Sequence, residues 1–156
     1  MAKMILSQAF TKVKSIKVFN LESFIMSVME MFAPVLKMLI PSYSKRLWVI
    51  IFEHTCRTYL LMVITMSTQY SPKESKILAE RLKTDKQTLK DLFTGQIPAR
   101  EIEESYADLD NFENCLRVRI EEIIEFLVPL AARLGNDFND NCVVGYRLSH
   151  RWLSCD

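Results

Sequence analysis

Six carboxylates lie within the segment from Glu101 to Glu113, and they are the densest group of chemically capable side chains in the sequence. Carboxylates at this density could hold metal ions, as they do in di-iron helical bundles, but such bundles need Glu-x-x-His pairs and the sequence contains none. Two interpretations stay open, a solvated acidic face and a docking surface for a basic partner. The candidate partner-binding residues are Glu101, Glu104, Asp108 and Glu113.

Other residues that could do chemistry are sparse or wrongly spaced. His54 and His150 are the only histidines, and neither has a partner at metal-ligand spacing. Residues 137–141 begin like a calcium-binding loop, but positions six and twelve, which need Gly and Glu, are Cys142 and Leu148. With three glycines, the chain has no phosphate-binding loop and no nucleophile elbow. We therefore predict that the protein is not an enzyme and uses neither a metal nor a cofactor.

The cysteines indicate a reducing compartment. They are widely spaced, and they form neither a C-x-x-C pair nor a zinc-type pattern with histidine. This favours reduced, mostly buried thiols and a cytoplasmic protein. The four residues are Cys56, Cys115, Cys142 and Cys155.

Charge is divided unevenly along a chain whose net charge is only +1. Residues 1–60 carry eight Lys/Arg and three acids, whereas residues 61–156 carry twelve and sixteen. The even total argues against nucleic-acid binding. The basic segment 1–20 fits contact with an anionic membrane surface or an acidic partner through Lys12, Lys14 and Lys17, and an amphipathic transit peptide is the alternative interpretation.

The elements that would position these residues are long helices. Glycine and proline together number eight in 156 residues, below average usage, so few tight turns are available. We predict an all-α chain in a single domain, residues 1–156, folded as an antiparallel bundle of about six long helices. Helical spacing and breakers place these helices at about residues 3–18, 20–40, 42–67, 72–94, 98–134 and 142–153.

Several boundaries are marked by particular residues. Asn20 is the expected N-cap of the second helix, which Pro34 should kink or restart and Pro41 should stop. Residues 71–74 form a capping box with proline at the first helical position. In the acidic helix, a break or bend is expected near residues 108–110.

The helix expected from residue 42 to 67, capped by Ser42 or Ser44, is apolar on nearly all sides. Residues 47–66 would be long enough to cross a bilayer, but Glu53, His54 and Arg57 interrupt them, so a central helix surrounded by protein is favoured. Methionines at helical spacing are expected in the core, and adaptable groove packing is the alternative. They include Met26, Met29, Met31, Met38, Met62 and Met66.

A series of helix landmarks runs through residues 45–120. Leu47-Trp48 opens a long apolar helix, and Ser71-Pro72-Lys73 opens the next. The following landmarks are Leu82, Asp85, Leu89 and Phe93, then Pro98, Ser105, Leu109, Phe112 and Leu116. In this series the chain resembles the helical-rod tethering and priming proteins called CATCHR, which include exocyst subunits and MUN domains.

This resemblance implies a non-enzymatic module of membrane traffic that binds SNARE helices or tether subunits, cytoplasmic or peripheral to a membrane. A chain of this length would be either one bundle of a longer rod, which would self-associate through an exposed apolar end, or a short relative. A compact Bcl-2-like or viral regulator that binds a partner helix in a groove is the alternative.

Overall fold

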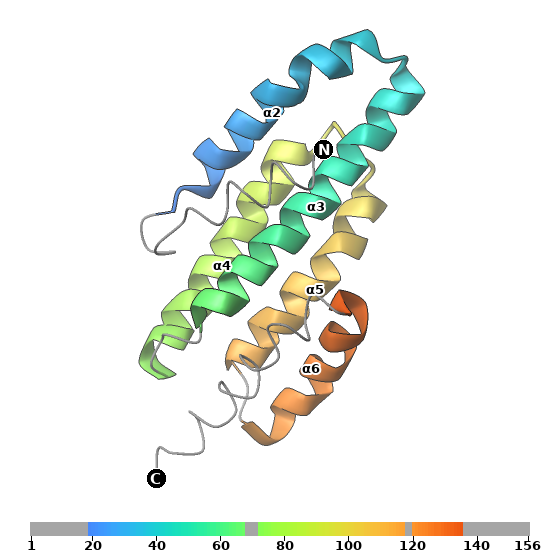
Figure 1. The fold of residues 1–156 in the computed structure, drawn as a ribbon. Helices are drawn as coiled ribbons and strands as arrows, with labels where there is room; N and C mark the ends of the chain where they lie inside the picture. Colours follow the sequence, from blue (N-terminus) through green and yellow to red (C-terminus); the bar gives the residue numbers. More distant parts are fainter. Residues whose placement is uncertain (1–18, 68–71, 118–119, 136–156) are drawn as a thin grey trace. The chain divides into compact units, whose positions relative to one another are not determined.

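The computed structural model describes residues 19–67, 72–117 and 120–135, and within these ranges the chain is all-α (Figure 1). The fold class predicted from the sequence is confirmed. The described residues form five helices where about six long ones were expected, and the helices predicted at 3–18 and 142–153 lie outside them. The five are α2 (Leu21–Met38), α3 (Pro41–Ser67), α4 (Pro72–Phe93), α5 (Ala99–Arg117) and α6 (Ile120–Leu134).

Helix α2 begins where the sequence predicts. The side chain of Asn20 accepts a hydrogen bond of 3.0 Å from the Ser23 N–H, which satisfies one of the donors left open by the first turn. The helix is continuous through Pro34, so the predicted restart there is wrong. Its buried residues are separated by four, three and eight positions, so they lie on one side of the helix. They are Leu21, Ile25, Val28 and Leu36.

Helix α3 begins earlier than predicted, at Pro41 rather than after Ser42 or Ser44. The Ser44 N–H already donates to the Ile40 carbonyl at 3.0 Å, so the first turn includes the proline. Proline fits the first helical position because its φ is preset and its missing N–H would have no partner there. Pro41 therefore both ends the connection from α2 and starts α3.

The described residues of the predicted acidic helix form two helices, and the break or bend expected near residues 108–110 is wrong. Helix α5 passes through residues 108–110 without interruption, because Leu109 and Phe112 keep the buried seam in helical register. It ends at Arg117, and α6 begins at Ile120.

Both glycines of the described residues end a helix, as predicted. Gly95, after α4, has φ +88°, and Gly135, after α6, has φ +58°. These left-handed conformations let the chain leave each helix, and they are strained for residues with a side chain.

The chain divides into two compact units whose boundaries fall inside α3, α4 and α5. The first unit contains the residues up to Tyr59 together with Asp85–Tyr106, and the second contains Leu60–Thr84 together with the residues from Ala107 onward. Each unit has its own buried side chains.

Aromatic rings form the centre of the first unit. The Phe93 ring, at the end of α4, lies 4.9 Å from that of Phe52 and 6.0 Å from that of Trp48 between centroids. Tyr106 of α5 lies 6.0 Å from Phe52 on the same scale. Phe52 and Phe93 are fully buried, so these contacts fix how the helix ends of this unit pack.

Neighbouring helices of the first unit run in opposite directions. Trp48 early in α3 contacts Phe93 late in α4, and Tyr59 later in α3 donates its hydroxyl to Asp85 earlier in α4. Five residues separate α4 from α5, and Tyr106, seven residues into α5, donates its hydroxyl to the carbonyl of Lys86, seven residues before the end of α4. Both pairs are therefore antiparallel within this unit.

Among its described residues, the second unit has an aliphatic core with one buried aromatic ring, Phe112. Helix α4 contributes the buried leucines Leu78 and Leu82, and α5 contributes Leu109 and Leu116. Further buried side chains come from α3 and α6, and these are Leu60, Met62, Val63, Ile64, Leu130 and Leu134.

Among the described residues, Pro41–Ile64 of α3 is the one stretch long and apolar enough to cross a membrane, and half of its most apolar window is buried inside the protein. Its fully buried residues begin at Ile51, whereas Ile40–Tyr43 and Lys45–Arg46 are exposed. The prediction of a helix covered on every side is therefore wrong for its first turns.

Candidate interaction surfaces

In the first unit, the acidic residues of α5 lie at the protein surface beside an arginine. Arg100 Nε pairs with Glu104 Oε1 at 2.8 Å, one helical turn apart. Glu104 raises the pKa of Arg100 most strongly, and the charge of Glu101 adds to this effect. Of the two predicted residues, Glu104 is exposed and in an ion pair, whereas Glu101 is half-buried.

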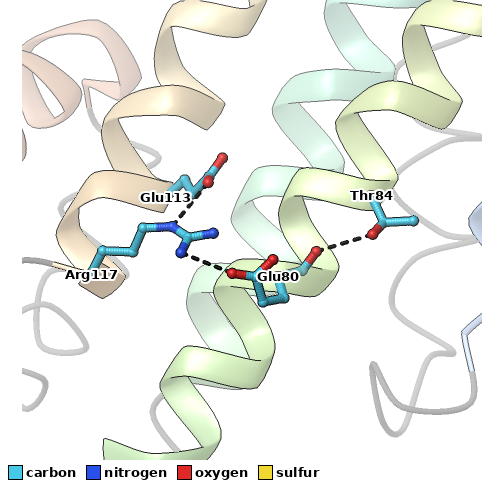
Figure 2. A network of polar contacts seen from close by, with 4 residues as sticks. All are labelled: Glu80, Thr84, Glu113 and Arg117. Carbon is cyan, nitrogen blue, oxygen red and sulfur yellow. Dashed lines mark hydrogen bonds and ion pairs between the residues drawn. The ribbon is translucent and has the colours of Figure 1, made fainter.

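In the second unit, Arg117 joins two helices. Figure 2 shows its guanidinium between Glu113 of its own helix and Glu80 of α4. Its Nη1 lies 2.9 Å from Glu80 Oε1, and its Nε lies 3.0 Å from Glu113 Oε1. These partners, Glu80 first, raise the pKa of Arg117. Glu113 therefore contributes to an intrachain network.

Asp108 is also paired within the chain, with Arg133 of α6 at 2.8 Å. Asp108 and Glu113 are five residues apart, and at about 100° per residue their side chains leave the helix in directions roughly 140° apart. Three of the four predicted carboxylates thus take part in ion pairs with arginines. A basic partner would have to compete with those arginines to bind this surface.

The predicted basic contacts Lys12, Lys14 and Lys17 lie outside the described residues, as do Cys142 and Cys155. The predicted burial of Cys56 and Cys115 is confirmed, and burial raises the pKa of the Cys115 thiol to about 12. No group of three or more His, Cys, Asp or Glu side chains in the described part of the chain could hold a metal ion.

An exposed apolar stripe runs along α2. Met31, Val35 and Met38 follow at intervals of four and three residues, so they lie on one side of the helix. Met31 and Val35 are about half exposed, and Met38 is 87% exposed. The expectation that the methionines fill the core is wrong for Met26, Met31 and Met38, which are exposed, although it holds for Met62.

A second exposed surface, residues 37–46, follows the stripe along the chain and contains the connection from α2 to α3. We call this surface the tip. Leu39 is exposed at its edge, while Ile40 is 59% and Tyr43 61% exposed. Three cations, all exposed, lie in the same short segment. They are Lys37, Lys45 and Arg46.

Sequence reasoning missed both surfaces, although two signals were present. The large apolar residues of helix α2 outnumber its four buried residues. Some of them must therefore lie on its exposed side. From Met31 to Phe52 the sequence contains three cations and no acid. Apolar residues that lie among cations, with no acid nearby, are typical of an interaction surface rather than of a core.

No protein-family model matches the chain, and no curated protein or solved structure matches it.

Proposed function

We propose that the protein is a non-enzymatic helical interaction module of membrane traffic, cytoplasmic or peripheral to a membrane, which binds partner helices such as those of SNAREs or tether subunits. The observation that carries the proposal is the exposed stripe of Met31, Val35 and Met38. A contiguous apolar surface that stays exposed on a folded chain often marks a binding site for a partner.

The spacing of the stripe suits a helical partner. Amphipathic helices recognise one another through apolar residues at intervals of three and four, and the stripe presents such a series outward. Two of its three residues are methionines, whose unbranched side chains adapt to partners of different shape. A second apolar helix laid along α2 would remove all three side chains from water.

The fold proposal that accompanies this function is an antiparallel bundle that is one segment of a helical rod. The opposite directions of α3 and α4, and of α4 and α5, within the first unit support the antiparallel part. The exposed stripe supports the rod part, because stacking of successive bundles needs an apolar face.

A compact regulator of the Bcl-2-like or viral type is the second candidate. The buried residues of α3 between Ile51 and Ile64 support it, since such regulators contain a central apolar helix. The two candidates differ in their partners: the regulator should bind a single amphipathic peptide as a monomer, whereas a rod segment should bind other tether subunits or itself.

Affinity capture from a cell lysate tests the proposal, with the full chain as bait and the double variant Met31→Ser/Val35→Ser beside it. We expect SNARE or tether subunits to be retained by the unchanged protein and lost from the double variant. A matched control is Ile77→Ser, which removes a still more exposed apolar side chain from α4. Recovery of no such subunit, or equal recovery with the stripe variant, would contradict the proposal.

A further inference from the structure

We propose that the tip binds the surface of an anionic lipid membrane, with Leu39, Ile40 and Tyr43 entering the headgroup region and Lys37, Lys45 and Arg46 contacting lipid phosphates and carboxylates. This site differs from the α2 stripe, and its partner is a lipid surface rather than a protein helix. The inference rests on the exposure of the tip, its projection beyond α4 and its charge.

The tip is the most continuously exposed apolar segment of the described chain. From Lys37 to Arg46, every residue is exposed except Ser44, which is half-buried. Tyr43 has an apolar ring and a polar hydroxyl, the combination that favours a membrane interface. Exposing these apolar side chains to water costs free energy, which burial against a partner would recover.

The tip also projects beyond its neighbour in the first unit. Helices α3 and α4 are antiparallel there, and Phe93, the last residue of α4, contacts Trp48 of α3. The seven residues of α3 before Trp48 therefore extend past the end of α4 by roughly 10 Å, at about 1.5 Å per residue. A flat membrane surface can reach such a projection, whereas a partner helix needs a groove or a long stripe.

Charge at the tip fits an anionic surface. Within the described part of the chain, no ion pair involves Lys37, Lys45 or Arg46. The nearest acids along the sequence are Glu30 and Glu53, at least seven residues from any of these cations. Each cation near an anionic leaflet strengthens binding roughly fivefold, which is about 1 kcal/mol. The first N–H groups of α3 add positive potential at the same end of the helix.

Co-sedimentation of the full chain with lipid vesicles tests the inference. We expect binding to vesicles of phosphatidylcholine with phosphatidylserine, little binding to phosphatidylcholine alone, and weakening as salt is raised. Lys45→Glu/Arg46→Glu should weaken binding at least roughly 25-fold, by the same contribution per cation. Ile40→Ser/Tyr43→Ser should weaken it at unchanged net charge.

Matched variants separate the tip from general charge effects. Lys83→Glu/Lys90→Glu changes the net charge equally at two exposed lysines of α4, and it should retain most of the binding. Lys45→Arg/Arg46→Lys keeps both charges and should bind like the unchanged protein. The helical circular dichroism signal of each variant reports whether the chain is folded.

Three results would overturn the inference. One is binding that does not depend on phosphatidylserine, and another is equal loss in the tip and α4 charge variants. The third is a tip variant that binds normally while Lys12→Glu/Lys14→Glu/Lys17→Glu abolishes binding. The stripe variant Met31→Ser/Val35→Ser should still bind vesicles, so failure of the membrane proposal and failure of the partner-helix proposal give different results.

Discussion

Truncation of Phe93 to alanine tests the packing that holds the first unit together. The side chain is fully buried, and its ring lies against those of Phe52 at 4.9 Å and Trp48 at 6.0 Å. Removing a buried phenylalanine side chain costs about 3–5 kcal/mol, which includes the transfer term and the cavity left behind. Each aromatic pair contributes about 0.5–1.5 kcal/mol beyond its buried area, so we expect a loss in the upper part of that range.

Urea titration followed by circular dichroism measures this loss. With a urea dependence of roughly 2 kcal/mol per molar, a loss of 4 kcal/mol lowers the unfolding midpoint by about 2 M. Leu92→Ala is the matched control, because Leu92 is the preceding residue of α4 and is only half-buried. Its truncation should cost about 1 kcal/mol, on the basis of the smaller apolar area lost. Equal midpoint shifts for the two variants would refute the aromatic packing described here.

Three further predictions concern single residues. Asn20→Ala removes the N-cap of α2 and should lower the free energy of unfolding by about 1 kcal/mol, as measured in urea. Cys115 should resist alkylation in the folded protein up to about pH 9, because burial raises its pKa to about 12, and mass mapping of the alkylated sites would show this. Since the folded pKa is raised, the contribution of this thiol to stability is complete below about pH 8.5 and is lost as the pH rises towards 12. Arg117→Ala breaks the pairs with Glu80 and Glu113. Arg117 and Glu80 are exposed whereas the Glu113 side chain is only 13% exposed, so the loss should be about 1 kcal/mol, mainly from the pair with Glu113, and smaller at high salt in thermal melts.

The helices could be predicted from the sequence where a local signal marks them. The N-cap Asn20, the proline start of α4 and the glycines after α4 and α6 each act through the backbone of their own turn. The start of α3 was predicted wrongly because a proline can end one helix and begin the next, and the sequence alone does not separate the two roles.

Which side of each helix is covered could not be predicted in the same way. Burial depends on neighbours far apart in the sequence, so Met31 and Met62 look alike in a helical pattern although only Met62 is buried. The acidic residues show the same limit, because Arg133 is distant in sequence from Asp108 and pairs with it only in the folded chain. Composition therefore predicted the fold class, while the surfaces available to a partner depend on the tertiary packing of each unit.

The central claim is that α2 and the tip present apolar side chains to a partner, and methionine oxidation tests it directly. Mild peroxide treatment followed by peptide mass mapping compares Met31 and Met38 with the buried Met62. We predict that Met31 and Met38 oxidise several-fold faster than Met62 in the folded protein and that the rates converge in urea. Equal rates in the folded protein would contradict the account.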